Sequence, residues 1–200
     1  MSILINRYRE RYLRNRNKKA MTDKLERYLF LDIDGVLNTN RYGNYRIDND
    51  MDEYDEDGDL FDPEAVANLK LILESVPDTK LIISSSWRFK GWDWMNHLWE
   101  KRDLPGTIYS MIPGLEKVMF ASHVPGQSNS YSVYPYGTRG IEIYEWLRLN
   151  AGQNPLSYKY AIIDDDTCDF LLMQKDHLVA TNPWDGITKE VAVKAIELLL

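Results

Sequence analysis

YLFLDIDGVLN, at residues 28–38, is a stretch in which a strand suited to a protein core runs directly into two carboxylates. Five of its first six residues are large and apolar or aromatic, a composition typical of a buried strand. Asp32 and Asp34 are two positions apart, so in an extended segment both side chains lie on one side. Gly35 then permits a sharp turn. An Asx turn would account for one aspartate but hardly for two, so the pattern indicates a binding site at the strand end.

Further strand signals alternate with helical segments along the chain. Asp62 followed by Pro63 is a well-formed helix start for residues 62–76. Two more helices are expected at 140–150 and at 188–200, where Thr188 can cap the second. The expected strands are 28–34, 80–84, 106–112, 158–164 and 177–181. This alternation predicts βαβ units, and therefore an α/β fold with a mainly parallel sheet and helices on both faces.

Composition and charge narrow the class of protein. The chain has 200 residues, is 44% hydrophobic, carries a net charge of -7 and contains one cysteine, Cys168. These features are typical of a globular protein in a reducing compartment. No stretch is long and apolar enough to span a membrane, and the N-terminus lacks the apolar centre of a signal peptide. We therefore expect a cytoplasmic protein that makes no contact with a membrane.

Three segments differ from the rest of the chain. Residues 1–27 hold nine Lys or Arg and three acidic residues. A solvated basic extension is the simpler interpretation, and attraction to nucleic acid is the alternative. Residues 39–61 are polar and acidic, and residues 121–138 are rich in Ser, Gly, Pro and Tyr, so both are expected to be loops without regular structure. Residues 28–200 are expected to form one domain.

A second group of carboxylates follows the strand expected at 158–164. The sequence YAIIDDDTCD places acidic residues at positions 164, 165, 166 and 169. If this strand neighbours the first, four or more carboxylates converge, and they repel one another unless a cation neutralises them. Oxygen ligands without histidine or cysteine indicate Mg²⁺ rather than zinc. Either strand end alone would be explained by a loop cap, but together they predict a magnesium site.

Hydroxyl and guanidinium groups are candidates for binding an anion at the same edge. The sequence IISSSWR, residues 82–88, ends a strand with three serines and an arginine. Hydroxyls and exposed backbone N–H groups at a strand end suit a phosphoryl oxygen, and a polar turn is the alternative. Arg139 lies at the expected start of a helix, where the helix dipole and the guanidinium both attract an anion. A single arginine there would otherwise be an ordinary surface residue.

These motifs, taken in order, resemble those of the haloacid dehalogenase (HAD) superfamily. Asp-x-Asp-Gly occurs in DIDGVLN, a serine closes the strand in IISSSWR, Arg139 starts a helix, and an acidic pair follows the strand in IIDDD. The resemblance spans residues 28–200 and is closest to a branch that includes phosphatase-like domains of RNA-repair proteins. It implies a Rossmann-like three-layer sandwich in which residues 39–61 form a minimal cap insertion.

The resemblance also implies catalytic roles. Asp32 would be the nucleophile that forms an aspartyl-phosphate. Asp34 would protonate the leaving oxygen and then act as the base on water. Arg139 would clamp the phosphate, although lysine is more usual at this position. Of the serines, Ser85 would bind the phosphate, because a strand over 80–84 leaves it first outside the sheet, and Ser84 is the close alternative.

The remaining assignments concern the metal and the substrate. Mg²⁺ would be held by Asp32, by the backbone carbonyl of Asp34, and by Asp164 or Asp165. Asp166 and Asp169 leave open which acidic pair contacts the ion. Further substrate contacts are expected from a glycine, two serines and an arginine: Gly35, Ser84, Ser86 and Arg88.

The expected activity is that of a Mg²⁺-dependent phosphomonoester hydrolase. Nucleotides or polynucleotide-end phosphates rank first as substrates, because of the branch resemblance, the basic N-terminus and the aromatic loops. Sugar phosphates or other small metabolites are the alternative. A catalytically idle domain that binds nucleic acid or a protein through residues 1–27 is a third reading, and the intact pair of Asp32 and Asp34 argues against it.

Tryptophans crowd residues 87–99. Trp92, Met95 and Trp99 share one face of an expected helix, so packing in the core is their expected role. The alternative is a stacking platform for a base, to which three tyrosines of the segment 121–138 could contribute: Tyr131, Tyr134 and Tyr136.

Overall fold

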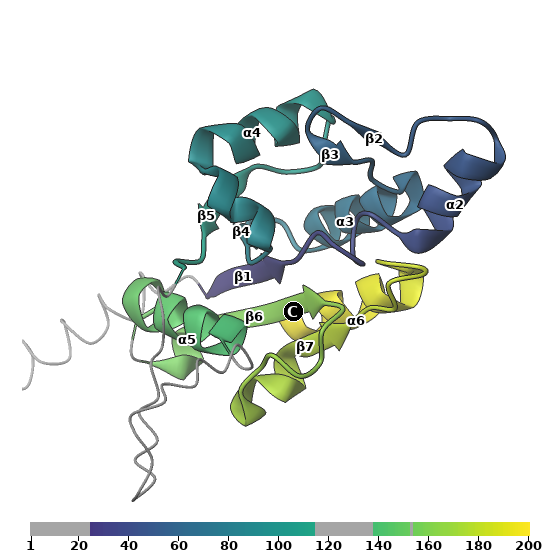
Figure 1. The fold of residues 1–200 in the computed structure, drawn as a ribbon. Coiled ribbons are helices and arrows are strands. Elements are labelled where there is room, and N and C mark those ends of the chain that lie inside the picture. Colours follow the sequence, from purple (N-terminus) through teal and green to yellow (C-terminus); the bar gives the residue numbers. More distant parts are fainter. Residues whose placement is uncertain (1–24, 115–137, 153) are drawn as a thin grey trace, which may run out of the picture.

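A sheet of five parallel strands, in the order β5-β4-β1-β6-β7, forms the centre of the computed structural model (Figure 1). The structure describes residues 25–114, 138–152 and 154–200. The strands are β1 (Glu26–Leu31), β4 (Lys80–Ile83), β5 (Ile108–Met111), β6 (Tyr158–Asp164) and β7 (Leu178–Ala180). Each coincides with a segment in which the sequence predicted a strand, and the parallel pairing confirms the predicted α/β class.

The first strand begins two residues before the expected start. Glu26 and Arg27 are part of β1, where they pair with Tyr158 and Lys159 of β6. The Arg27 side chain also donates through Nε to the Leu199 carbonyl at 2.9 Å. The boundary expected at residue 27 therefore falls inside the sheet, and the rest of the basic segment, residues 1–24, lies outside the described residues.

Helices cover both faces of the sheet (Figure 1). One core contains buried residues of α3 (Pro63–Ser75), α4 (Trp92–Lys101) and α6 (Lys189–Leu199), and the other contains those of α5 (Thr138–Asn150). Alternate residues of β1, β4 and β6 belong to the two cores, because successive side chains of a strand point to opposite faces. This is the three-layer arrangement that the sequence predicted. Three short 3-10 helices complete it: η1 (Ser86–Lys90), η2 (Pro155–Ser157) and η3 (Leu172–His177).

Two helix starts are formed as the sequence predicted. Asp62 caps α3 by accepting a hydrogen bond from the Glu64 backbone N–H at 2.9 Å, and Pro63 occupies the first turn. Thr188 caps α6 by accepting from the Val191 backbone N–H at 3.3 Å. In both cases the signal is local, because the side chain that ends the loop also satisfies a backbone group of the helix.

The insertion at residues 39–61 is more ordered than predicted. It contains the helix α2 (Asn40–Asp48) and a hairpin of β2 (Tyr54–Asp55) and β3 (Gly58–Asp59), so the expectation of a loop without regular structure is wrong. No residue of α2 is buried, and the helix therefore lacks the apolar periodicity by which a helix is recognised.

Contacts with α4 hold the hairpin of this insertion in place. Lys101 Nζ lies 2.5 Å from both Glu56 Oε1 and Asp57 Oδ2, and Arg102 Nη2 lies 3.0 Å from Asp55 Oδ1. The part of the acidic run at residues 55–57 is thus neutralised by two basic residues more than forty positions further along the chain.

The tryptophan-rich helix packs differently from the prediction at one position. Met95 and Trp99 are buried in α4 as expected, together with Leu98. Trp92 is 44% exposed, because as the first residue of the helix it lies beyond the packed face. The tyrosines proposed as a stacking platform, at 131, 134 and 136, lie outside the described residues.

Within the described part of the chain, no helix has the length and apolar character needed to cross a membrane.

Candidate functional site

The carboxyl ends of the three central strands bring three polar residues to one level. In the sheet register Leu31 is opposite both Ile83 and Ile163, so Asp32, Ser84 and Asp164 come next on adjacent strands. By strand alternation all three point to the face covered by α5. Backbone hydrogen bonds continue to this level, with the Asp32 N–H donating to the Ile163 carbonyl at 3.0 Å.

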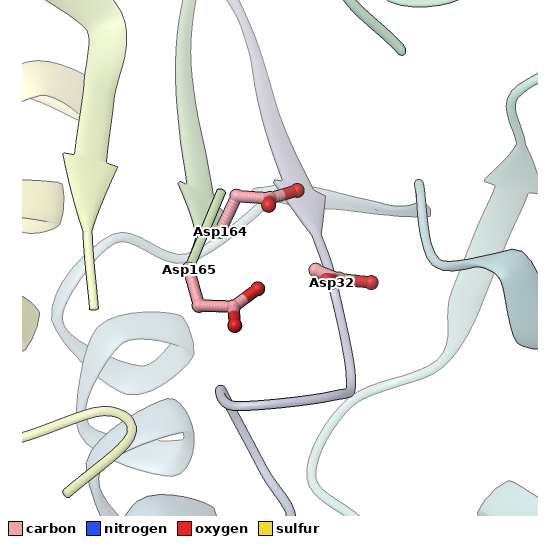
Figure 2. Close-up of side chains that lie close together, drawn as sticks. All are labelled: Asp32, Asp164 and Asp165. Atoms are coloured by element: carbon pink, nitrogen blue, oxygen red, sulfur yellow. The ribbon is translucent and has the colours of Figure 1, made fainter. Parts of the chain in front are cut away.

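Three carboxylates converge at this edge (Figure 2). Asp32, Asp164 and Asp165 each offer an oxygen, and these oxygens lie within 4.8 Å of one another. Asp32 is 3% exposed and Asp164 is fully buried. The predicted meeting of the two acidic strand ends is therefore found, and both candidates at 164 and 165 belong to the cluster. The carboxylates of Asp34, Asp166 and Asp169 do not belong to it.

Arg139, at the start of α5, reaches into the same cluster. Its Nη1 atom lies 2.9 Å from Asp32 Oδ2 and 2.5 Å from Asp164 Oδ2. The N-terminus of α5 is fixed nearby, because the Gly140 N–H donates to the Asp169 carbonyl at 2.9 Å and Gln174 Nε2 donates to the Gly140 carbonyl at 2.8 Å. A side chain on residue 140 would collide with this segment, since a Cβ there would lie 2.7 Å from Gln174 Oε1. The predicted convergence of Arg139 with the carboxylates is thus present.

The charges of the cluster are not balanced. Burial raises the pKa of Asp164 to about 7, the charge of Asp32 adds to the rise, and Arg139 opposes it. Burial and then Asp32 also raise the pKa of Asp165. Burial acts to lower the pKa of Arg139, but attraction to Asp32 and Asp164 outweighs it and leaves that pKa above its ordinary value. Among the described residues, one guanidinium contacts three clustered carboxylates, which leaves a need for further positive charge.

The donor set fits a divalent cation. All three ligands are carboxylate oxygens, the type that hard cations such as Mg²⁺ prefer. Asp32 Oδ1 is buried and has no hydrogen-bond partner among the described residues, so it is a free ligand atom in a place where an unsatisfied polar atom is costly. A cation bound here would satisfy that atom and reduce the repulsion within the cluster.

A divalent cation is expected to stabilise the protein more at pH 8 than at pH 6. Because the pKa of Asp164 is raised in the fold, its proton stabilises the cation-free protein below about pH 7, and this contribution is lost as the pH rises through about 7. The cation needs the ionised form, so it competes with that proton. At roughly a hundred times its Kd it should add about 2.7 kcal/mol, or a Tm rise of about 5–10 °C at pH 8. Differential scanning fluorimetry with MgCl₂ at both pH values measures this.

Matched variants test whether the effect arises at this cluster. Asp165→Asn should remove most of the cation-dependent rise in Tm. Asp166→Asn should keep it, because Asp166 lies next in sequence but accepts a hydrogen bond from the Cys168 N–H outside the cluster. An equal rise in Tm at pH 6 and pH 8, or one that persists in Asp165→Asn, would place the cation elsewhere.

The serine that faces the cluster is Ser84 rather than Ser85. β4 ends at Ile83, one residue earlier than the sequence suggested, so Ser84 is the first residue beyond the strand. Its Oγ is buried without a hydrogen-bond partner among the described residues. Ser85 Oγ instead caps η1 by accepting from the Trp87 N–H at 3.3 Å, and Ser86 is exposed. The geometry therefore favours Ser84, the alternative in the sequence-based assignment, as the hydroxyl available to a phosphoryl oxygen.

Arg88, which the sequence predicted to contact the substrate, is bound to protein groups in the structure. Its guanidinium is buried and donates to the carbonyls of Ser84 at 2.8 Å and Ser85 at 2.9 Å. It also forms a salt bridge of 2.6 Å with Glu142 of α5. Burial lowers the pKa of Arg88, although Glu142 opposes this. These contacts hold the serine turn against α5, and the expected contact of Arg88 with a substrate stays a prediction.

Asp34 lies beside the cluster and is held by a residue that the sequence did not single out. Trp87 Nε1 donates to both carboxylate oxygens of Asp34, at 3.0 and 3.1 Å, and Asn38 Nδ2 donates to Oδ1 at 2.8 Å. The sequence gives no signal that distinguishes Trp87 from the neighbouring tryptophans. Gly35 has a positive φ of 65°, and a Cβ there would lie 2.6 Å from Asp165 Oδ2, so the turn requires glycine.

Comparison with known families gives one finding. The sequence model of the family described as HAD domain in Swiss Army Knife RNA repair proteins matches residues 28–192. The match covers the strands and the loops that carry Asp32, Ser84, Arg139 and Asp164. No curated protein and no solved structure matches the chain.

Proposed function

Because this chain belongs to the family of HAD domains in Swiss Army Knife RNA repair proteins, we propose that it is a Mg²⁺-dependent phosphomonoester hydrolase that acts through an aspartyl-phosphate. The family supports a HAD-type hydrolase. The observation that carries the finer proposal is the position of Asp32. It is buried beside the Arg139 guanidinium and next to the strand that ends at Ser84, whose hydroxyl has no partner among the described residues, and Asp34 is two residues away.

The proposed reaction has two steps. In the first, an oxygen of Asp32 attacks phosphorus, the ester P–O bond breaks, and Asp34 gives its proton to the departing alcohol oxygen. In the second, Asp34 takes a proton from water, the water oxygen attacks the same phosphorus, and Asp32 leaves as a carboxylate. Each step moves one proton and exchanges one bond to phosphorus, so the cycle restores Asp32 and Asp34.

The other residues of the site bind and neutralise the phosphoryl group. Arg139 holds the Asp32 carboxylate and can donate to phosphoryl oxygens from the same side. The Ser84 hydroxyl supplies a further donor. Mg²⁺ held by Asp32, Asp164 and Asp165, with the carbonyl of Asp34, would offset the negative charge of both nucleophile and phosphate.

A phosphate-release screen tests this proposal. The substrates are nucleotides, 3′- and 5′-phosphorylated oligonucleotides, sugar phosphates and an aryl phosphate, each with Mg²⁺ and with EDTA. We expect Mg²⁺-dependent release, with nucleotides or polynucleotide ends ahead of sugar phosphates; nucleic acid could be guided by the basic residues 1–27. Release that is unaffected by EDTA contradicts the metal dependence. No release from any ester would favour a binding domain without catalytic activity.

Trp87→Phe is expected to lower kcat about tenfold for alkyl phosphates, with little change in KM. The phenyl ring keeps much of the packing, but the single N–H that both Asp34 carboxylate oxygens share is lost, and a hydrogen bond to a charged group is worth roughly 1.5–3 kcal/mol. The loss should be smaller for an aryl phosphate, whose leaving group needs less protonation. Trp94→Phe is the control, since Trp94 packs against Trp87 at 6.0 Å between ring centroids. Equal losses for both esters would show that Trp87 does not act through Asp34.

A further inference from the structure

A polar hollow opens beside Asp34. Its volume is about 420 Å³. It lies between the turn that follows β1, the helix α2, the β2–β3 hairpin and the turn at Trp184. Amides and carboxylates dominate its lining, which includes Asn40, Asn44, Glu53 and Asp59. The hollow thus begins at the residue that the proposed reaction uses as its acid and base.

The negative charge of this hollow is not neutralised by any residue that the structure describes. No Lys or Arg is among the described residues that line it. Within the described part of the chain, the side chains of Glu53 and Asp59 make no hydrogen bond or ion pair. The carboxylates here also do not converge as those of the metal cluster do, so a single cation is not the ligand they suit.

Basic side chains in this neighbourhood are engaged elsewhere. Arg41 pairs with Asp62 at 3.0 Å and with Glu64 at 2.7 Å. Lys101 and Arg102 pair with the acidic tip of the hairpin. The acidic residues in this half of the insertion therefore fall into two groups, one neutralised by α4 and one facing the hollow. That division is a tertiary feature, because both groups lie in the same acidic run of the sequence.

We propose that this hollow receives the alcohol part of the phosphomonoester and selects alcohols that carry no further negative charge. The proposal rests on the proposed function, since Asp34 can protonate the leaving oxygen only if the alcohol lies on its side. A second phosphate in the hollow would meet Glu53 and Asp59 without a cation between them. Hydroxyl groups would meet amide and carboxylate partners, and a flat ring could lie against Trp184, which is 47% exposed.

The substrate class is therefore that of nucleoside monophosphates and sugar monophosphates. Bisphosphates, and a terminal phosphate flanked by a phosphodiester, are disfavoured by the same repulsion. Of the two substrate classes ranked first under the proposed function, the hollow therefore favours mononucleotides and disfavours polynucleotide ends. The discrimination is electrostatic, so it should weaken as salt screens the charges over a few ångströms at high ionic strength.

The test compares kcat/KM for adenosine 3′- and 5′-monophosphate with that for adenosine 3′,5′-bisphosphate, and repeats the comparison with a hexose monophosphate and bisphosphate. At low salt the wild type should prefer the monophosphates by about tenfold, and less at 1 M NaCl. The double variant Glu53→Gln, Asp59→Asn should bring the preference close to one. Glu56→Gln is the matched control, because it removes one negative charge from the same hairpin but from the group paired with Lys101. It should keep the preference.

Two outcomes would overturn this inference and leave the proposed function intact. The first is an aryl phosphate hydrolysed by the wild type with no preference for monophosphates over bisphosphates. The second is a preference that is unchanged in the double variant, or reduced equally in Glu56→Gln. Failure of the proposed function looks different, because it abolishes phosphate release from every ester, including the aryl phosphate.

Discussion

Replacing Asp32 by asparagine is expected to lower phosphate release by more than about 10³-fold while the chain remains folded. Asparagine has the same shape but cannot form the aspartyl-phosphate. The substitution also removes one of three negative charges that lie close together, so the thermal stability of the cation-free protein should be unchanged or higher. Steady-state hydrolysis of an aryl phosphate, together with a thermal unfolding curve of the same preparation, measures both effects.

Asp166→Asn is the matched control for this prediction. Asp166 is also an acidic residue at a strand end, but its Oδ1 accepts from the Cys168 N–H at 2.7 Å, a bond that asparagine can keep. Its activity should stay within a few-fold of the wild type. If Asp32→Asn retained a tenth of the wild-type rate, Asp32 would not be the nucleophile.

Replacing Arg88 by methionine is expected to cost about 3–5 kcal/mol of unfolding free energy. Arg88 and Glu142 form a salt bridge of 2.6 Å, and both side chains are less than a tenth exposed. Methionine fills much of the space but leaves the Glu142 carboxylate buried without this cation. It also removes the donors that hold the carbonyls of Ser84 and Ser85. Urea denaturation followed by circular dichroism gives the change in unfolding free energy.

Two further variants separate burial from the mere loss of an ion pair. Lys70→Met breaks an exposed pair with Glu74, whose charged atoms are 3.8 Å apart, and should cost no more than about 1 kcal/mol. The double variant Arg88→Met, Glu142→Leu should recover part of the loss, because the buried carboxylate that paired with Arg88 is then removed as well. A cost below about 1 kcal/mol for Arg88→Met would mean that the pair does not hold the serine turn against α5.

The sequence was sufficient wherever a structural signal lies within a few consecutive residues. The apolar run before Asp32 marks a buried strand, and the pair of Asp62 and Pro63 marks a helix start, because both depend on local geometry. The meeting of Asp32 with Asp164 also followed from local signals, since parallel strands end at the same edge of a sheet.

Other features were decided by residues far apart in the chain. The insertion at 39–61 has a helix with no buried residue and a hairpin held by Lys101 and Arg102. The sequence of the insertion therefore gives little indication of its structure, because the contacts that order the hairpin come from another helix. The choice of Ser84 over Ser85 depends on the residue at which β4 ends. Pairing with β1 places that end at Ile83, one residue before the predicted end.

By itself, then, the amino-acid sequence determined the alternation of the five sheet strands with helices, the parallel arrangement of those strands and the chemical identity of the acidic centre. Only the tertiary structure decided that Arg88 supports the serine turn, that Trp87 holds Asp34, and that part of the acidic insertion faces a hollow while the rest is neutralised. The physical reason is that the residue type fixes the charge and hydrogen-bonding capacity of a side chain. The partner that it binds depends on which distant segments the fold brings within reach.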